Sequence, residues 1–356
     1  MKNLTDLLTL PGNGVYTVHT GADKKEKLFK SYYNTANIEK AREKWVKELS
    51  KLSDKKPWLL GIPSDTGGGI HRGANWGPLA LRSELLELKK SFTDLGDVRV
   101  IPHLLHDKYL NEETLKSCRK ALYGKANKLP VSPLSIAEKS LADLYKSYPK
   151  ARVLGFGGDH STSYPLVKTW IESRKNKKKS ALLHFDAHTD LLQSRLGIDI
   201  CFGTWTYQVL DMFASRDHVI QIGIRSSGKD KKYWKETLGV EQIWAREVNK
   251  LGADKIASNI IAHYKKLGIE ELYISFDIDA LDEKYAAATG TPEKDGLLPS
   301  DCAAIIKKIS SEIKITGADL MEVAPFVWPA GVEARDQQSS LSVAADMAKI
   351  LLHTLQ

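Results

Sequence analysis

The amino-acid sequence predicts an α/β fold with a central, mainly parallel sheet of about eight strands. Short continuous apolar runs recur along the 356-residue chain, and such runs are typical of parallel strands buried on both faces. Helical patterns separate the runs, as the crossover connections of a parallel sheet require. No internal repeat or low-complexity linker divides the chain, so we expect a single domain over residues 56–356, preceded by a mostly helical extension over residues 1–55.

The first predicted elements lie between the N-terminus and residue 101. Lys/Glu-rich sequence around Asn37–Lys51 predicts a helix, and the apolar run Trp58–Pro63 then predicts a strand that ends in Gly and Pro. A glycine-rich loop with the sequence SDTGGGIHRGANWGP follows, and Pro78–Lys89 is predicted to be a helix. Because Asp94–Asp97 is prone to form a turn, the second strand is expected at Val98–Ile101.

Six further apolar runs, alternating with helical patterns, complete the predicted sheet. In open parallel sheets, ligands bind beyond the carboxyl ends of the strands, so a functional site is expected at that edge. The six runs are Arg152–Phe156, Ser180–Phe185, His218–Gly223, Gln242–Trp244, Glu271–Phe276 and Glu312–Val323.

The composition excludes several classes of protein. The net charge is 52 − 44 = +8, but the basic residues are dispersed, and their tightest cluster, Arg174–Lys179, is expected to be a solvated turn. No apolar run approaches the ~20 residues of a membrane span, and the N-terminus lacks a signal-peptide pattern. We therefore expect neither nucleic acid nor a membrane as a partner. The widely spaced Cys118, Cys201 and Cys302 argue against disulfides and a thiolate zinc site, which favours a cytoplasmic location.

Acid and imidazole side chains gather at three predicted strand ends. The stretch HFDAHTD directly follows an apolar run and has acid, imidazole and acid on alternating positions. Because side chains alternate along an extended chain, these three share one side, and the same holds for the two acids of FDID after a later strand. A histidine in GGDHS follows a third strand. The six candidate metal ligands are His160, Asp186, His188, Asp190, Asp277 and Asp279.

Four carboxylates at close range repel one another strongly unless cations lie among them. Two divalent ions with bridging carboxylates satisfy this charge balance, and mostly oxygen ligands with some imidazole favour Mn²⁺ over other divalent metals. A pair of ions ~3.5–4 Å apart ionises a bridging water at neutral pH, which gives a hydrolase without a covalent nucleophile. Each fragment alone is a weak signal, because acidic strand ends also cap helices and buried histidines also have structural roles. Three fragments together favour a metal site.

Several motifs resemble those of the ureohydrolase family, which contains arginases, agmatinases, other guanidino-acid hydrolases and formiminoglutamases. The resemblance extends from about Leu60 to the C-terminus. Three stretches are similar to the family's signatures: GGDHS at 157–161, FDAHTD at 185–190 and SFDIDALD at 275–282. Others are similar to its accessory motifs: GANWGP with Arg82, TGTP at 289–292 and MEVAP at 321–325.

The resemblance implies a three-layer α/β/α sandwich, a binuclear Mn²⁺ centre held by the six candidate ligands, and a homo-oligomer, usually a trimer or hexamer. Hydroxide between the two ions would attack the central carbon of a guanidino or formimino group. By the same resemblance, Asp190 would pass a proton to the leaving nitrogen. Asp282 and Glu322 match carboxylates that orient the ligands and the backbone, with simple loop capping as the alternative role.

The pocket loops depart from those of arginases and agmatinases. These relatives have a His-Gly after the second motif, where the imidazole assists proton transfer, but Phe202 occupies the histidine's place here. Formiminoglutamases also lack this histidine, and their Ser-Gly-Thr type sequence is closer to Phe202–Thr204. Where arginases bind the α-amino group of the substrate with carboxylates, this chain has Ser226 and Ser227, so arginase activity proper is disfavoured.

Three further residues are candidate contacts of the substrate. Arg225 and the lysines within residues 229–232 make one loop basic, which suits a substrate with carboxylates, although a loop facing water is an equally good interpretation. Asp301 lies where arginases place a glutamate against the guanidinium, so a weaker contact is expected from the shorter acid. His71 in the glycine-rich loop is a candidate replacement for the missing proton shuttle, or else an exposed loop histidine.

The leading hypothesis is a binuclear manganese hydrolase of a small amidine. A formiminoglutamate-like or guanidino-acid substrate is favoured over agmatine, and agmatine over arginine. A second hypothesis is amide hydrolysis, as in the histone deacetylase relatives that share the fold, but those proteins keep a single zinc and lose part of the ligand set. A third is a metal-binding regulatory or assembly protein without catalysis, for which the absent shuttle histidine is the supporting feature.

Overall fold

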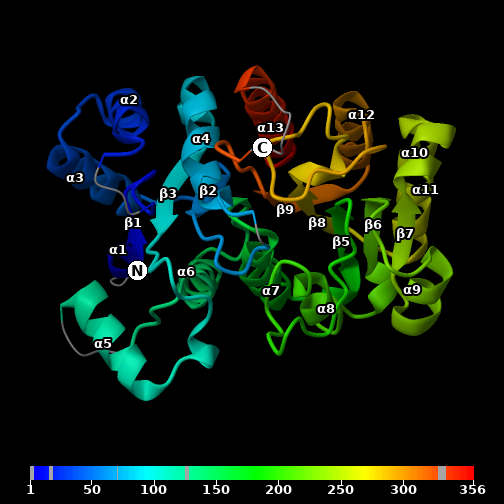
Figure 1. The fold of residues 1–356 in the computed structure, drawn as a ribbon, viewed down its shortest axis with the longest axis horizontal. Coiled ribbons are helices and arrows are strands. Elements are labelled where there is room, and N and C mark those ends of the chain that lie inside the picture. Colours follow the sequence, from blue (N-terminus) through cyan, green and yellow to red (C-terminus); the bar gives the residue numbers. More distant parts are fainter. Residues whose placement is uncertain (1–3, 16–18, 70, 125–127, 328–333) are drawn as a thin grey trace.

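The structure is a computed structural model that describes residues 4–15, 19–69, 71–124, 128–327 and 334–356. In this part of the chain, nine strands form one sheet in the order β1-β3-β2-β4-β9-β8-β5-β6-β7 (Figure 1). All neighbours pair in parallel except β1, which is antiparallel to β3, so the predicted, mainly parallel sheet is confirmed. The strands are β1 Leu8–Thr9, β2 Trp58–Ile62, β3 Thr93–Val98, β4 Val153–Gly157, β5 Ser180–Phe185, β6 Val219–Ile224, β7 Glu241–Trp244, β8 Glu271–Asp277 and β9 Lys314–Met321.

Helices cover both faces of the sheet, which confirms the three-layer α/β/α architecture (Figure 1). One layer consists of α2 (Ala22–Tyr33), α4 (Gly77–Glu84), α11 (Ala253–Lys266), α12 (Pro299–Ser310) and α13 (Ala334–Thr354). The other contains α6 (Pro133–Ser147), α7 (Ser163–Glu172) and α8 (Trp205–Leu210). The remaining helices are α1 Leu4–Leu7, α3 Ile38–Leu49, α5 Glu112–Tyr123, α9 Lys231–Leu238 and α10 Ala245–Leu251. None of the described helices combines the length and apolarity needed to cross a bilayer.

The central strands end together, and this alignment positions the polar residues that follow them. β5 and β8 pair in register, with Phe185 opposite Phe276 and their rings stacked at a centroid distance of 5.0 Å. Both strands are buried along almost their whole length, as continuous apolar sequences predict. Because the register is fixed, Asp186 after β5 and Asp277 at the end of β8 reach the same edge of the sheet.

The N-terminal segment contributes to the sheet and to the core. Leu8 of β1 lies opposite Val98 of β3, so β1 covers that edge of the sheet. Helices α2 and α3 follow, and the indole of Trp45 in α3 is 1% exposed and donates a hydrogen bond to the carbonyl of Leu95 at 3.3 Å. The segment therefore shares one hydrophobic cluster with the central strands.

Strand β3 begins five residues before the predicted strand Val98–Ile101, so that prediction is wrong. Asp94–Asp97, expected to be a turn, lies within β3. The buried guanidinium of Arg82 in α4 makes this possible, since it lies 2.8 Å from a carboxylate oxygen of Asp94 and 2.5 Å from one of Asp97. Ion pairing with a residue on a helix removes the cost of burying two acids in a strand, and local turn propensity does not include that contact.

Candidate metal centre

The six candidate ligands come together at the carboxyl edge of the sheet. His160 opens a short 3₁₀ helix after β4, and Asp277 and Asp279 flank the end of β8. The other three candidates follow β5. Five of the six are at most 6% exposed, and the sixth, His188, has 26% of its side chain exposed. A buried group of this kind is stable only if each charge has a partner.

The first cluster surrounds His160. Its Nδ1 lies 2.9 Å from Asp277 Oδ2, 3.1 Å from Asp186 Oδ2 and 3.4 Å from Asp190 Oδ2. Its Nε2 lies 3.1 Å from the Ser275 hydroxyl, which donates to Asp319 at 2.8 Å. The hydroxyl can therefore accept from Nε2–H, which leaves the Nδ1 lone pair directed at three carboxylates. Only a cation or a proton stabilises that arrangement, so these residues fit a divalent metal ion.

The second cluster surrounds His188. Its Nδ1 lies 3.1 Å from Asp279 Oδ2 and 3.4 Å from Asp186 Oδ1. The two oxygens of Asp186 thus face the two imidazoles, one each, so this carboxylate would be able to hold an ion beside each of them. Thr291 donates to Asp279 Oδ2 at 2.9 Å, and Glu293 lies 3.4 Å from the other ring nitrogen of His188.

Burial and mutual repulsion shift the acid–base properties of the group. Burial, reinforced by the charge of Asp186, raises the pKa of Asp190 well above its ordinary value. Burial together with the charge of Asp279 does the same to the pKa of Asp277. Burial opposes the charged form of His160, but hydrogen bonds to Asp186 and Asp277 outweigh it and raise the pKa of the imidazole. Each of these three shifts favours the protonated form of its group, so a divalent cation that binds here competes with protons.

Two non-glycine residues of the site have a left-handed backbone conformation. Asp190 has φ 50° and Glu322 has φ 61°. Such residues are uncommon, and the strain is tolerated where the surroundings hold the residue in place. At Glu322 the restraint is visible, because its Oε1 accepts the backbone N–H of His160 at 2.9 Å. The carboxylate therefore orients the segment that carries the His160 ligand.

Asp282 lies in the same loop region without touching a candidate ligand. Its Oδ2 accepts the N–H of Gly296 at 3.0 Å and its Oδ1 accepts the N–H of Lys284 at 3.1 Å. These bonds fold the segment that follows Asp279 back on itself. The contacts correspond to loop capping, the alternative role that the sequence leaves open for this residue.

The guanidinium of Arg225 is directed at backbone rather than at open space. Its three nitrogens donate to six carbonyl groups, which hold two loops next to the metal centre together. The accepting carbonyls belong to Gly223, Asp279, Ala280, Leu281, Glu293 and Lys294. With its donors engaged, Arg225 has a supporting position behind Asp279.

The other candidate substrate residues lie around the same edge. Ser226 forms an isolated bridge with His188, and the hydroxyl of Ser227 is occupied by the carbonyl of Lys229 at 2.7 Å. Asp301 is half-buried in the first turn of α12. His71 is exposed, and its backbone packs against Gly290 in the TGTP loop.

Sequence reasoning missed two side chains that contact the ligands through hydrogen bonds to carboxylates. The indole of Trp205 donates to Asp190 Oδ2 at 2.9 Å, and His184 Nε2 lies 2.8 Å from Asp186 Oδ2. His184 is the first letter of HFDAHTD and stands two positions before Asp186, so strand alternation already placed both on one side. For Trp205 no sequence signal separated a contact with the ligand from core packing.

A chain of buried amides determines the tautomer of His184. The indole N–H of Trp244 donates to Gln242 Oε1 at 3.0 Å, and Gln242 Nε2 donates to Gln221 Oε1 at 2.8 Å. Gln221 Nε2 then lies 3.0 Å from His184 Nδ1. Since an indole nitrogen only donates, every amide in the chain has one orientation, and His184 Nδ1 must accept. The proton is on Nε2, where it is donated to Asp186, so His184 supports a ligand instead of being one.

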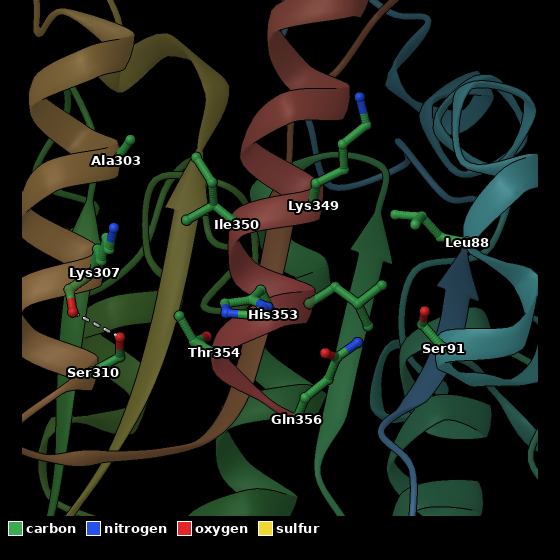
Figure 2. A pocket seen from close by; sticks show the side chains of 11 residues that line it. Leu88, Ser91, Ala303, Lys307, Ser310, Lys349, Ile350, His353, Thr354 and Gln356 are labelled. Carbon is green, nitrogen blue, oxygen red and sulfur yellow. Dashed lines mark hydrogen bonds between the residues drawn. The ribbon is translucent and has the colours of Figure 1, made fainter.

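Two cavities differ in where they lie relative to the candidate metal ligands. The larger, about 560 Å³, lies between α12 and α13, and its side chains include Ile350, His353 and Lys307 (Figure 2). None of the candidate ligands lines it. A cavity of about 290 Å³ lies instead between the glycine-rich loop and Phe202, on the loop that follows Asp190.

The sequence model of the Arginase family matches residues 55–352 of the chain. This match covers more than four-fifths of the molecule and contains all six candidate ligands.

The chain belongs to the arginase family.

Curated relatives of this arginase-family protein act in the same class of chemistry. It is 30% identical over 285 residues to the mitochondrial guanidino acid hydrolase of Homo sapiens, covering 75% of this chain and 71% of that protein. It is 32% identical over 274 residues to the agmatinase of Chromobacterium violaceum, covering 75% and 76%. The protein is therefore a hydrolase of C–N bonds, and it has buried clusters of histidine and aspartate residues that could hold metal ions.

Solved structures of the family share the fold. Proclavaminate amidino hydrolase from Streptomyces clavuligerus has a TM-score of 0.65 at 26% identity, with 84% of this chain and 91% of that chain covered. Formimidoylglutamase from Bacillus subtilis has a TM-score of 0.66 at 21% identity, with 85% and 89% covered. The second likeness concerns the fold alone.

Proposed function

We propose that the protein is a two-manganese hydrolase that cleaves a C–N bond of a guanidino or formimino acid. The observation that carries the proposal is Asp186, whose two oxygens face the imidazoles of His160 and His188. Two ions held there would lower the pKa of a shared water to near neutrality and so supply the hydroxide that attacks the amidine carbon. Oxygen-rich ligands with two imidazoles support manganese as the metal.

The chain's own residues then position the reaction. Trp205 fixes Asp190 Oδ2, so Oδ1 is the oxygen left to carry a proton to the leaving nitrogen. Glu322 holds the backbone of His160, and Arg225 holds the loop of Asp279, so neither ligand has to reorganise during the reaction. His71, Ser226, Ser227 and Asp301 remain candidate contacts of the substrate from the neighbouring loops.

The preference for an acidic substrate rests on the pocket sequence. Phe202 stands where a shuttle histidine is expected in arginases and agmatinases, and serines replace the carboxylates that would bind an α-amino group. The human relative named guanidino acid hydrolase supports this choice. Agmatine is the second candidate, because relatives named agmatinase are 28–32% identical to the chain. We further propose that the protein is cytoplasmic and that it forms a homo-oligomer, either a trimer or a hexamer. Light scattering tests the oligomeric state.

Turnover of defined substrates tests the proposed function. Manganese-loaded protein is incubated with formiminoglutamate, 4-guanidinobutyrate, 3-guanidinopropionate, agmatine and arginine, and products are identified by mass spectrometry. We expect formamide from formiminoglutamate or urea from the guanidino acids, and faster turnover of these acids than of agmatine and arginine. Asp279→Ala should abolish turnover and weaken binding of one metal ion, whereas the exposed Asp254→Ala should change neither. Full activity of Asp279→Ala contradicts the proposal, and two bound ions without any turnover indicate the non-catalytic alternative.

A further inference from the structure

One loop both holds a candidate metal ligand and lines a cavity. The loop begins at Asp190 and ends at Trp205, whose indole donates back to Asp190 at 2.9 Å. Between these two residues, Arg195 and Phe202 form one wall of the cavity of about 290 Å³, and Gly67–Gly69 form the opposite wall. The cavity is therefore built on the metal centre's own loop.

The guanidinium of Arg195 lies over the ring of Phe202, with its central carbon 4.8 Å from the ring centroid. No carboxylate contacts this guanidinium among the residues that the structure describes. A guanidinium stacked on an aromatic face keeps its planar fork of donors free, and that fork matches a carboxylate in a bidentate way.

The loop that carries Arg195 is fixed in place before any ligand binds. Hydrogen bonds tie it to itself, to the segment after β3 and to the glycine-rich loop, so little order has to be gained on binding. These bonds join Arg195 to Ile198 in both directions, Asp199 to Lys108 and Tyr109, and Phe202 to Gly67.

Three other cations near this edge have partners already. Arg225 donates to backbone carbonyls, Lys231 lies 2.8 Å from Glu247, and Lys232 lies 3.7 Å from Glu236. In the basic loop singled out in the sequence, Lys229 lies over the ring of Tyr233 at 5.3 Å, and the other three cations have partners outside the loop. Arg195 lines the cavity beside the glycine-rich loop and has no carboxylate partner in the described part of the chain.

We propose that Arg195 binds the carboxylate of the substrate and that this cavity takes the anionic end of an ω-guanidino or formimino acid. The inference rests on the proposed function and names its substrate class. The aromatic face of Phe202 then has a role of its own: it orients Arg195 and packs against the methylene groups of the substrate. A cationic amine such as agmatine would place its ammonium group next to the guanidinium of Arg195, and these like charges repel.

The test compares one ligand with and without its charge. 4-Guanidinobutyrate and its neutral amide, 4-guanidinobutyramide, are offered to manganese-loaded wild-type protein and to Arg195→Met and Arg195→Lys. Arg246→Met is the matched control, because Arg246 makes the same kind of ring contact with Trp244 at 4.9 Å. The KM is measured where the ligand is hydrolysed, and calorimetry supplies the Kd where it is not.

We expect the wild type to prefer the acid over the amide by about tenfold or more, as a charge-assisted pair requires. Arg195→Met should remove this preference with little change in kcat, while Arg195→Lys retains part of it and Arg246→Met retains all of it. A wild type without the preference, or without binding of either compound, overturns the inference, and so does a preference that survives in Arg195→Met. If neither compound is hydrolysed, 4-guanidinobutyrate is not the substrate and the proposed function depends on the other substrates offered above, whereas the Kd values still decide the role of Arg195.

Discussion

At the scale of single residues, hydrogen bonds behind the ligands decide which atoms face the metals. His160 and His184 are both buried next to Asp186, and simple proximity makes both of them candidate ligands. The hydrogen-bond partners of the two histidines distinguish their roles. Ser275 accepts from His160 Nε2 and leaves Nδ1 as a donor atom for metal, whereas Gln221 donates to His184 Nδ1 and leaves a proton facing Asp186.

The support of His184 by Gln221 leads to a prediction about metal affinity. Gln221→Leu removes the donor that fixes the tautomer, so Asp186 loses a defined hydrogen bond. We expect manganese affinity to fall by about 10–100-fold, the range seen when partners of metal ligands are removed. Competition with a fluorescent chelator measures this change. Gln208→Leu is the control, since the side chain of Gln208 donates to the carbonyl of the exposed Gln193 at 2.9 Å, and equal affinities in both variants would contradict the prediction.

The raised pKa of the buried Asp319 leads to a prediction of how the stability of the fold depends on pH. Burial raises the pKa of this carboxyl to about 6, against the lowering influence of His160 and the Ser275 and Tyr273 hydroxyls. The folded state thus keeps a proton that the unfolded chain releases near pH 4, and the resulting stability is lost as pH rises from about 4 to about 6. We compare the free energies of unfolding of the wild type and of Asp319→Asn. We expect their difference, wild type minus variant, to fall by on the order of 2 kcal/mol over this window.

This difference is measured by urea denaturation of the metal-free proteins at several pH values. Groups that do not interact with Asp319 titrate equally in both proteins and cancel in the comparison. A difference that stays constant or rises between pH 4 and pH 6 would show that the carboxyl is ionised throughout.

At the scale of elements, strand β3 depends on a helix for its stability. Asp94 and Asp97 are fully buried in the strand, and both are paired with Arg82 of α4, which is also fully buried. The glycine between them, Gly96, has φ 93° and its carbonyl also accepts from Arg82 at 3.0 Å. An ion network therefore fastens the first helix after the glycine-rich loop to the edge of the parallel sheet.

Breaking this network should be costly. Arg82→Leu leaves two buried carboxylates without a cation, and we expect a loss of about 3–5 kcal/mol in the free energy of unfolding. Lys265→Ala breaks an exposed pair with Glu312 at 2.7 Å and should cost less than ~1 kcal/mol. Chemical denaturation distinguishes the two cases. Similar small losses in both variants would mean that the strand does not rely on Arg82.

At the scale of the whole molecule, the N-terminal segment closes one edge of the sheet. β1 pairs with β3, and Trp45 of α3 is buried in the common core. Deletion of residues 1–50 would expose an edge strand and an apolar surface, so we expect the shortened protein to aggregate. Size-exclusion chromatography checks this outcome. A monodisperse product with an unchanged unfolding midpoint would show that the segment is dispensable.

The sequence by itself determined the parallel strands and the residues at their ends, because continuous apolar runs and alternation along a strand are local properties. β5 covers the predicted residues, and the three polar motifs meet at one edge of the sheet as expected. Only the tertiary structure decided that Asp186 faces both imidazoles, that Arg225 is bound to carbonyls while Arg195 stacks on Phe202, and that Asp94 and Asp97 lie in a strand. Each of these outcomes depends on contacts between side chains of different strands, helices and loops or on the fold of a loop, and neither local apolar patterns nor turn propensities contain such contacts.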